Sequence, residues 1–155
     1  MMTNLSCKVL AALSGKFLVT AESCTGGGIG AALTTVPGSS KVYKGGIISY
    51  TNAVKASQLG VDPKLLERVG AVSAPVAEAM AVGVRHKLDA DIAVSVTGLA
   101  GPDGDEFGNP VGTVFVGYAD SGISLAREFH FIGDREEIRA QTIEAALRLV
   151  LEQNE

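Results

Sequence analysis

The chain is poor in cysteine, tryptophan and charge, and each shortage narrows what the protein can be. Among 155 residues there is no tryptophan and only two cysteines, Cys7 and Cys24, too few for a disulfide framework. Charged residues make up 19% with a net charge of −4, so the clustered cations that non-specific nucleic-acid binding needs are absent. No apolar run approaches the roughly 20 residues of a membrane span, and the N-terminus does not resemble a signal peptide. We therefore expect a cytoplasmic protein with neither nucleic-acid nor membrane partners.

Hydrophobic residues make up 46% of the chain, which is enough for a substantial core, and no repeat or linker interrupts it. We expect residues 1–155 to form a single domain. Short apolar runs predict strands at 17–20, 46–50 and 91–96, and a hairpin of strands 111–118 and 123–131. Helical spacing and capping residues predict helices over 5–13, 29–33, 52–59 and 74–88, a helical turn from Pro63, and a final helix after Asp134. This alternation predicts an α/β fold, with a mixed sheet covered by helices on both faces.

Polar residues gather where three of the predicted strands end. Glu22, Ser23, Cys24 and Thr25 follow the first strand. Tyr50, Thr51 and Asn52 follow the second, and Thr97 and Gly98 follow the third. In open α/β sheets, ligand sites gather where the carboxyl ends of strands meet helix N-termini. The convergence of these three strand ends therefore predicts the site.

Ser23 stands between a predicted strand and a predicted helix, and two interpretations fit it. Serine is a common helix N-cap, so a purely structural role is one of them. The other is a nucleophile beside the backbone N–H groups of a glycine-rich turn, which can stabilise an oxyanion or bind a phosphate. Gly26 and Gly27 permit close approach of a ligand to that backbone.

A serine nucleophile needs a base, and the two histidines are poorly placed to serve as one. His86 stands between two basic residues on a predicted exposed helix face, and His130 lies late in the hairpin. Lys55 lies in the first turn of the helix after the second strand. There the helix dipole and burial would both lower its pKa and favour the neutral amine. An ordinary surface lysine is the alternative.

Four other residues are candidates for a role in the site. Tyr50 can hydrogen-bond a transferred proton or the substrate, or simply pack. Cys24 can itself be a nucleophile near a helix N-terminus, where thiol pKa values fall. Arg135 and Arg139 share one face of the last helix, where they can meet a phosphate or pair with neighbouring carboxylates, and the surface role suits Arg135 better.

No metal or cofactor is expected. The Cys and His spacing fits no zinc site, and the glycine-rich turn lacks the lysine of a Walker loop. The acidic loop 101–109 begins like an EF-hand, but Phe107 occupies a ligand position and Val114 stands where the bidentate Glu belongs. We interpret this loop as a flexible lid over the site or as a plain surface loop.

Seven short motifs, in order and spread over nearly the whole chain, resemble the CinA C-terminal domain family. They are Ala21-Glu22-Ser23-Cys24-Thr25-Gly26-Gly27, Val36-Pro37-Gly38-Ser39-Ser40, Tyr50-Thr51-Asn52 with Lys55, Gly70-Ala71-Val72-Ser73, Val96-Thr97-Gly98-Leu99-Ala100-Gly101-Pro102-Asp103-Gly104, Pro110-Val111-Gly112-Thr113-Val114 and Gly133-Asp134-Arg135. The sequence of loop 105–109 differs from the usual sequence of the family at this place. The chain begins just before the first motif, so it resembles the stand-alone form of the family.

The family includes amidases that hydrolyse the carboxamide of nicotinamide mononucleotide to nicotinate mononucleotide and ammonia, in pyridine nucleotide recycling. The resemblance implies a three-layer α/β/α sandwich, a homo-oligomer, and a serine–lysine acyl-enzyme mechanism without a metal. It implies Ser23 as nucleophile and Lys55 as general base, with Tyr50 as a third catalytic residue, and either Lys55 or Tyr50 protonates the departing ammonia. The expected substrate-binding residues are Glu22, Cys24, Thr25, Gly26, Gly27, Thr97, Gly98 and Arg139. A catalytically silent nucleotide-binding domain and a hydrolase of another small amide are the alternatives.

Overall fold

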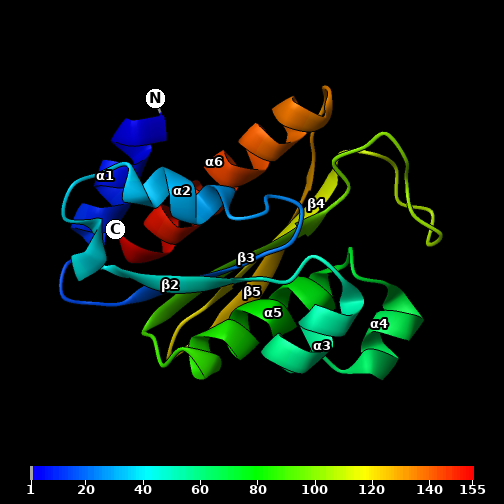
Figure 1. Cartoon of the computed structure of the whole chain (residues 1–155), viewed down its shortest axis with the longest axis horizontal. Coiled ribbons are helices and arrows are strands. Elements are labelled where there is room, and N and C mark those ends of the chain that lie inside the picture. Colours follow the sequence, from blue (N-terminus) through cyan, green and yellow to red (C-terminus); the bar gives the residue numbers. More distant parts are fainter. Residues whose placement is uncertain (1) are drawn as a thin grey trace.

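The structure is a computed structural model that describes residues 2–155, and it contains a five-stranded mixed sheet between two layers of helices (Figure 1). The strand order is β2-β1-β3-β4-β5. The strands are β1 (Leu18–Glu22), β2 (Tyr43–Ile48), β3 (Ile92–Gly98), β4 (Thr113–Ala119) and β5 (Ser124–His130). The helices are α1 (Met2–Ala12), α2 (Gly28–Thr34), α3 (Asn52–Leu59), α4 (Pro63–Val69), α5 (Ala74–Lys87) and α6 (Arg135–Asn154), with a short 3₁₀ turn at Ser39–Lys41.

Strand direction decides where the polar strand ends meet. β1 runs parallel to β2 and to β3, and Glu22 at its end pairs with Ile48 on one side and Val96 on the other. The carboxyl ends of these three strands therefore lie together at one edge of the sheet. β4 and β5 are antiparallel and form the hairpin predicted from the sequence.

The two helical layers bury different cores. α1, α2 and α6 cover one face of the sheet and α3, α4 and α5 cover the other (Figure 1). β1 is buried along its whole length, whereas every residue of β5, at the sheet edge, is exposed or half-buried. The predicted three-layer α/β/α sandwich with a mixed sheet is confirmed.

Helix capping follows the sequence closely at three places. Thr51 caps α3 by accepting a hydrogen bond from the N–H of Val54, and Asp62 caps α4, which has Pro63 at its first position. Asp134 and Glu137 form a capping box at the start of α6, each side chain accepting from the other's backbone N–H. Along residues 2–155, no helix combines the length and apolarity that crossing a bilayer requires.

The start of α2 rules out one of the two interpretations of Ser23, that of a helix N-cap. α2 begins at Gly28, and its N-cap is Gly27, which has no side chain to accept a hydrogen bond from the helix. Gly26 and Gly27 have φ values of 58° and 105°, a region that glycine enters without the penalty other residues pay. These two glycines let the chain make a wider turn, so Ser23 lies in the turn itself and not at the helix end.

Candidate active site

The three strand ends enclose a pocket of about 330 Å³, within the usual size range of small-molecule sites. Its walls come from the turn after β1, the start of α3, the segment before α5, the end of β3 with the loop that follows, and the first residue of α6. The lining residues are Ser23, Cys24, Tyr50, Asn52, Lys55, Ala71, Val72, Thr97, Gly98, Leu99, Ala100, Gly101, Pro102, Asp103 and Arg135.

Ser23 and Lys55 meet in this pocket. The Nζ of Lys55 lies 3.0 Å from the Oγ of Ser23, although 32 positions separate the two residues in the chain. Ser23 is only 7% exposed and Lys55 only 1% exposed. A buried lysine in hydrogen-bond contact with a serine has the geometry that activation of a serine by an amine requires.

The surroundings of Lys55 increase the share of its neutral form and hold its Nζ in place. Burial lowers the pKa of Lys55 from 10.5 to about 8, because desolvation penalises the charged amine. Its Nζ also contacts the carbonyl oxygens of Ser49, at 2.8 Å, and Tyr50, at 3.3 Å. A neutral amine has two N–H bonds for these two carbonyls and one lone pair left for the hydroxyl proton of Ser23.

Glu22 supports the turn that carries Ser23. Its side chain is 2% exposed, and its carboxylate accepts hydrogen bonds from the Thr25 hydroxyl at 2.6 Å, the Ile29 N–H at 2.9 Å and the Gly30 N–H at 3.0 Å. The first N–H groups of α2 are therefore satisfied inside the protein. The helix N-terminus that the sequence suggested as a source of donors for an oxyanion or phosphate is not free to act as one.

Arg139 braces the same turn from the α6 side. Its Nε donates to the carbonyl of Cys24 at 3.1 Å and its Nη2 to the carbonyl of Thr25 at 3.0 Å. Of the expected substrate-binding residues, Cys24, Thr97 and Gly98 line the pocket. Glu22, Thr25, Gly26, Gly27 and Arg139 are not among the lining residues.

Arg135 enters the pocket, a position that the sequence argument did not favour over the surface. Its Nη1 donates to the carbonyl of Gly101 at 2.5 Å and its Nη2 to the hydroxyl of Tyr50 at 3.0 Å. Two hydrogen bonds leave three of the five guanidinium N–H donors for a ligand. The signal was present in the Gly133-Asp134-Arg135 motif, but only the fold brings the first turn of α6 to the end of β2.

Cys24, Tyr50 and Thr97 have distinct environments in the pocket. Burial raises the pKa of Cys24 to about 11, so its thiol is protonated near neutral pH and is a poor nucleophile. Tyr50 is 58% exposed, with its hydroxyl held by Arg135. The hydroxyl of Thr97 donates to the carbonyl of Ala71 at 2.8 Å and so ties the end of β3 to the segment before α5. His86 and His130 are both exposed and outside the lining, as the sequence predicts.

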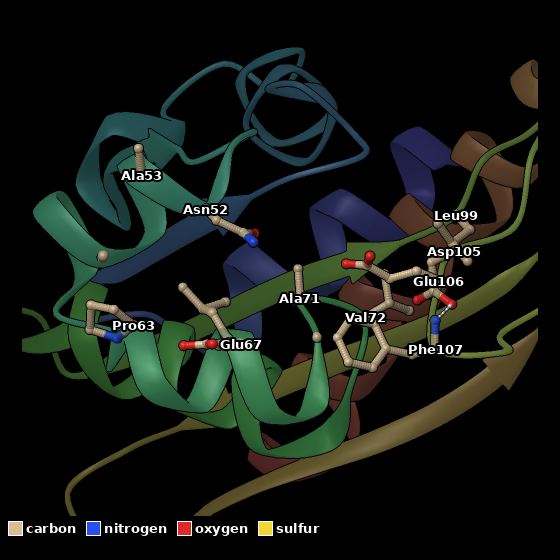
Figure 2. A pocket seen from close by; sticks show the side chains of 13 residues that line it. Asn52, Ala53, Pro63, Glu67, Ala71, Val72, Leu99, Asp105, Glu106 and Phe107 are labelled. Atoms are coloured by element: carbon tan, nitrogen blue, oxygen red, sulfur yellow. Dashed lines mark hydrogen bonds between the residues drawn. The ribbon is translucent and has the colours of Figure 1, made fainter.

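A second cavity of about 740 Å³ adjoins the pocket, and we call it the annexe (Figure 2). Its walls are α3, α4, the segment before α5 and the loop after β3. The two cavities share Asn52, Ala71, Val72 and Leu99, and the annexe is further lined by Ala53, Ala56, Pro63, Leu66, Glu67, Gly70, Asp105, Glu106 and Phe107. The annexe is mainly apolar, with carboxylates at its rim.

The acidic loop after β3 forms one wall of the annexe. The carboxylate of Asp105 accepts hydrogen bonds from the backbone N–H groups of Phe107 and Asn109, and Asn109 donates to the carbonyl of Val72. These bonds tie the loop to the wall that both cavities share. Within residues 2–155, no three His, Cys, Asp or Glu side chains gather as metal ligands would.

The chain is similar in sequence to a known protein family and to several of its members. The model of the CinA C-terminal domain matches residues 3–154. A CinA-like protein of Thermosynechococcus vestitus is 54% identical over 116 residues, which cover 74% of this chain and 28% of that protein. The chain thus spans about a third or less of the CinA-like proteins it matches first.

A shorter relative and a solved structure match over most of their length. The nicotinamide-nucleotide amidohydrolase PncC of Pseudomonas putida is 49% identical over 130 residues, which cover 84% of this chain and 81% of that protein. A crystal structure of a CinA superfamily protein from Klebsiella pneumoniae superimposes with a TM-score of 0.96 at 34% identity, covering 99% of this chain and 97% of that one. Similarity of this extent covers every element that builds the pocket.

Proposed function

Since the chain belongs to the CinA C-terminal domain family, we propose that it is a nicotinamide-nucleotide amidohydrolase that converts nicotinamide mononucleotide to nicotinate mononucleotide and ammonia. The observation that carries this proposal is the buried pair of Ser23 and Lys55, 3.0 Å apart. The 49% identity to a relative named for this activity supports the choice of substrate. The proposed setting is the cytoplasm, where pyridine nucleotides are recycled.

Acylation begins with the neutral amine of Lys55. The amine accepts the proton of the Ser23 hydroxyl as Oγ attacks the carboxamide carbon. The carbonyls of Ser49 and Tyr50 orient the two remaining N–H bonds, which keeps the lone pair on the serine. Lys55, now an ammonium, donates the proton to the departing nitrogen, and ammonia leaves. Water then hydrolyses the ester on Ser23 with Lys55 again acting as base.

The oxyanion needs donors close to Ser23. The N–H of Ser23 is bonded to the carbonyl of Val96 at 3.1 Å, and the first N–H groups of α2 are bonded to Glu22. We assign the role to the N–H group of Cys24, the residue that directly follows Ser23 and lines the pocket. Arg139 holds the carbonyls of Cys24 and Thr25, so it steadies the turn that carries this donor.

The charge distribution supports one direction for the mononucleotide in the pocket. Arg135 is the cation at the pocket wall with unused donors, and it lies beside Tyr50. A phosphate is best placed there, because a guanidinium binds it with paired hydrogen bonds. The pyridine ring and ribose then extend from Ser23 toward Arg135.

The test is ammonia release from nicotinamide mononucleotide by the purified protein. Ser23→Ala is expected to lower kcat by about a thousandfold or more with an unchanged circular dichroism spectrum, because the nucleophile is lost without loss of packing. Thr35→Ala removes a hydroxyl outside the pocket and serves as the matched control. Activity of Ser23→Ala close to that of the control would refute the acyl-enzyme mechanism.

The alternatives give different results in the same assay. A silent nucleotide-binding domain binds the mononucleotide, seen by calorimetry, and releases no ammonia. A hydrolase of another small amide releases ammonia from other carboxamides and not from the mononucleotide.

A further inference from the structure

The annexe is left without an occupant when nicotinamide mononucleotide binds in the proposed direction. It is more than twice the volume of the pocket, and it joins the pocket through a wall of Asn52, Ala71, Val72 and Leu99. Most of its other lining is apolar, with the ring of Phe107 facing α4 (Figure 2). A cavity of this size and lining beside a reactive serine suits an apolar group.

The rim charges of the annexe argue against the nucleotide lying there. Glu67 on α4 and Glu106 in the acidic loop both line it, and no lysine or arginine does. A phosphate placed between these carboxylates would be repelled, whereas at Arg135 it is attracted. The annexe and Arg135 therefore receive opposite ends of a substrate whose carbonyl carbon lies at Ser23.

A carboxamide carbon has two substituents besides its oxygen, the ring carbon and the nitrogen. With the ring directed to Arg135, the nitrogen is directed to the annexe. We infer that the annexe is a leaving-group subsite, so that the enzyme also hydrolyses secondary carboxamides of the same nucleotide in which the amide nitrogen bears an apolar group. This inference rests on the proposed function and extends its substrate class.

The chemistry is balanced with the groups already named. Ser23 Oγ forms a bond to the carbonyl carbon and its proton passes to Lys55. The carbon–nitrogen bond breaks, and Lys55 returns the proton to the nitrogen, which leaves as a neutral primary amine. Water then cleaves the acyl-enzyme to nicotinate mononucleotide, so no oxidant, reductant or further reactant is needed.

The experiment compares nicotinamide mononucleotide with its N-benzyl amide on the full chain, by measuring ammonia and benzylamine release. Phe107→Ala removes an annexe wall, and Phe17→Ala is the matched control because both phenylalanines are 42% exposed and Phe17 lines neither cavity. We expect benzylamine release by the unmodified protein. Phe107→Ala should lower the ratio of kcat/KM for the benzyl amide to that for the primary amide by about tenfold, because the benzyl group loses an aromatic contact. The control should leave this ratio unchanged.

Three results would overturn the inference, and they are distinguishable. Ammonia release from the primary amide without benzylamine release refutes the leaving-group subsite and leaves the proposed function intact. Benzylamine release with a ratio that is unchanged in Phe107→Ala shows that the benzyl group lies elsewhere. Turnover of neither compound refutes the proposed function and this inference together.

Discussion

The buried Lys55 couples activity and stability to pH, and the coupling can be measured. Burial lowers the pKa of Lys55 to about 8 in the folded protein, against 10.5 for the unperturbed amine. Between these two values the unfolded chain binds more protons than the folded one, so the free energy of unfolding rises with pH. Below pH 8 both states are protonated, and above 10.5 neither is.

The size of the effect follows from the two pKa values. Integrating the proton difference from pH 7 to pH 10 gives a gain of about 2.5 kcal/mol in the free energy of unfolding from this group. Lys55→Met removes the titrating amine and keeps an unbranched side chain. At each pH, the free energy of unfolding of Lys55→Met is subtracted from that of the unmodified protein. The other titrating groups cancel in this difference, so its change between pH 7 and pH 10 is the contribution of Lys55.

The assay is urea unfolding of both proteins at pH 7 and pH 10, together with kcat/KM for nicotinamide mononucleotide across the same range. The neutral fraction of Lys55 rises from about a tenth at pH 7 to most of the population at pH 9, so kcat/KM should rise by about tenfold and then level off. Lys55→Met should be inactive at every pH. If the stability difference is independent of pH, or if kcat/KM is flat from pH 7 to 9, the reasoning about the neutral amine is wrong.

Three further predictions concern the residues around the pair. Glu22→Gln keeps one oxygen and puts an amide NH₂ in place of the other, so either the N–H of Ile29 or that of Gly30 loses its acceptor. We expect the free energy of unfolding in urea to fall by about 1 to 3 kcal/mol and kcat to fall with little change in KM, and Glu22→Ala should lower both the stability and kcat further. Arg135→Met should raise KM for the mononucleotide by about tenfold or more and leave the KM for free nicotinamide, which lacks the phosphate, unaffected, as steady-state kinetics will test. Cys24→Ala should keep most of the activity, and iodoacetamide should not inactivate the unmodified protein at pH 7, because the thiol is buried and its pKa is raised to about 11.

Much of the fold could be predicted from the sequence, because the helix caps and the hairpin depend on residues close together in the chain. The caps Thr51, Asp62 and Asp134 act on N–H groups within three residues, so the residue type and its position suffice to predict them. The hairpin of β4 and β5 is likewise set by a short turn between two apolar strands. The interpretation that does not hold is Ser23 as an N-cap, because the N-terminus of α2 is satisfied by a side chain farther away in the chain. Glu22 bonds N–H groups seven and eight residues ahead, which no short-range capping pattern describes.

For the site, the sequence by itself determined which chemical groups are available. These are a serine in the turn after one strand, a lysine in the first turn of a helix after another strand, no histidine in a usable place, and a set of motifs that resembles one family. The tertiary structure alone decided which of these groups touch. Parallel pairing of β1 with its two neighbours brings Lys55 within 3.0 Å of Ser23 and buries it, and burial is what lowers its pKa. The fold also turns Arg135 into the pocket and leaves Arg139 behind it. Residues far apart in the chain meet only when the sheet closes, so no pattern along the sequence reports those distances.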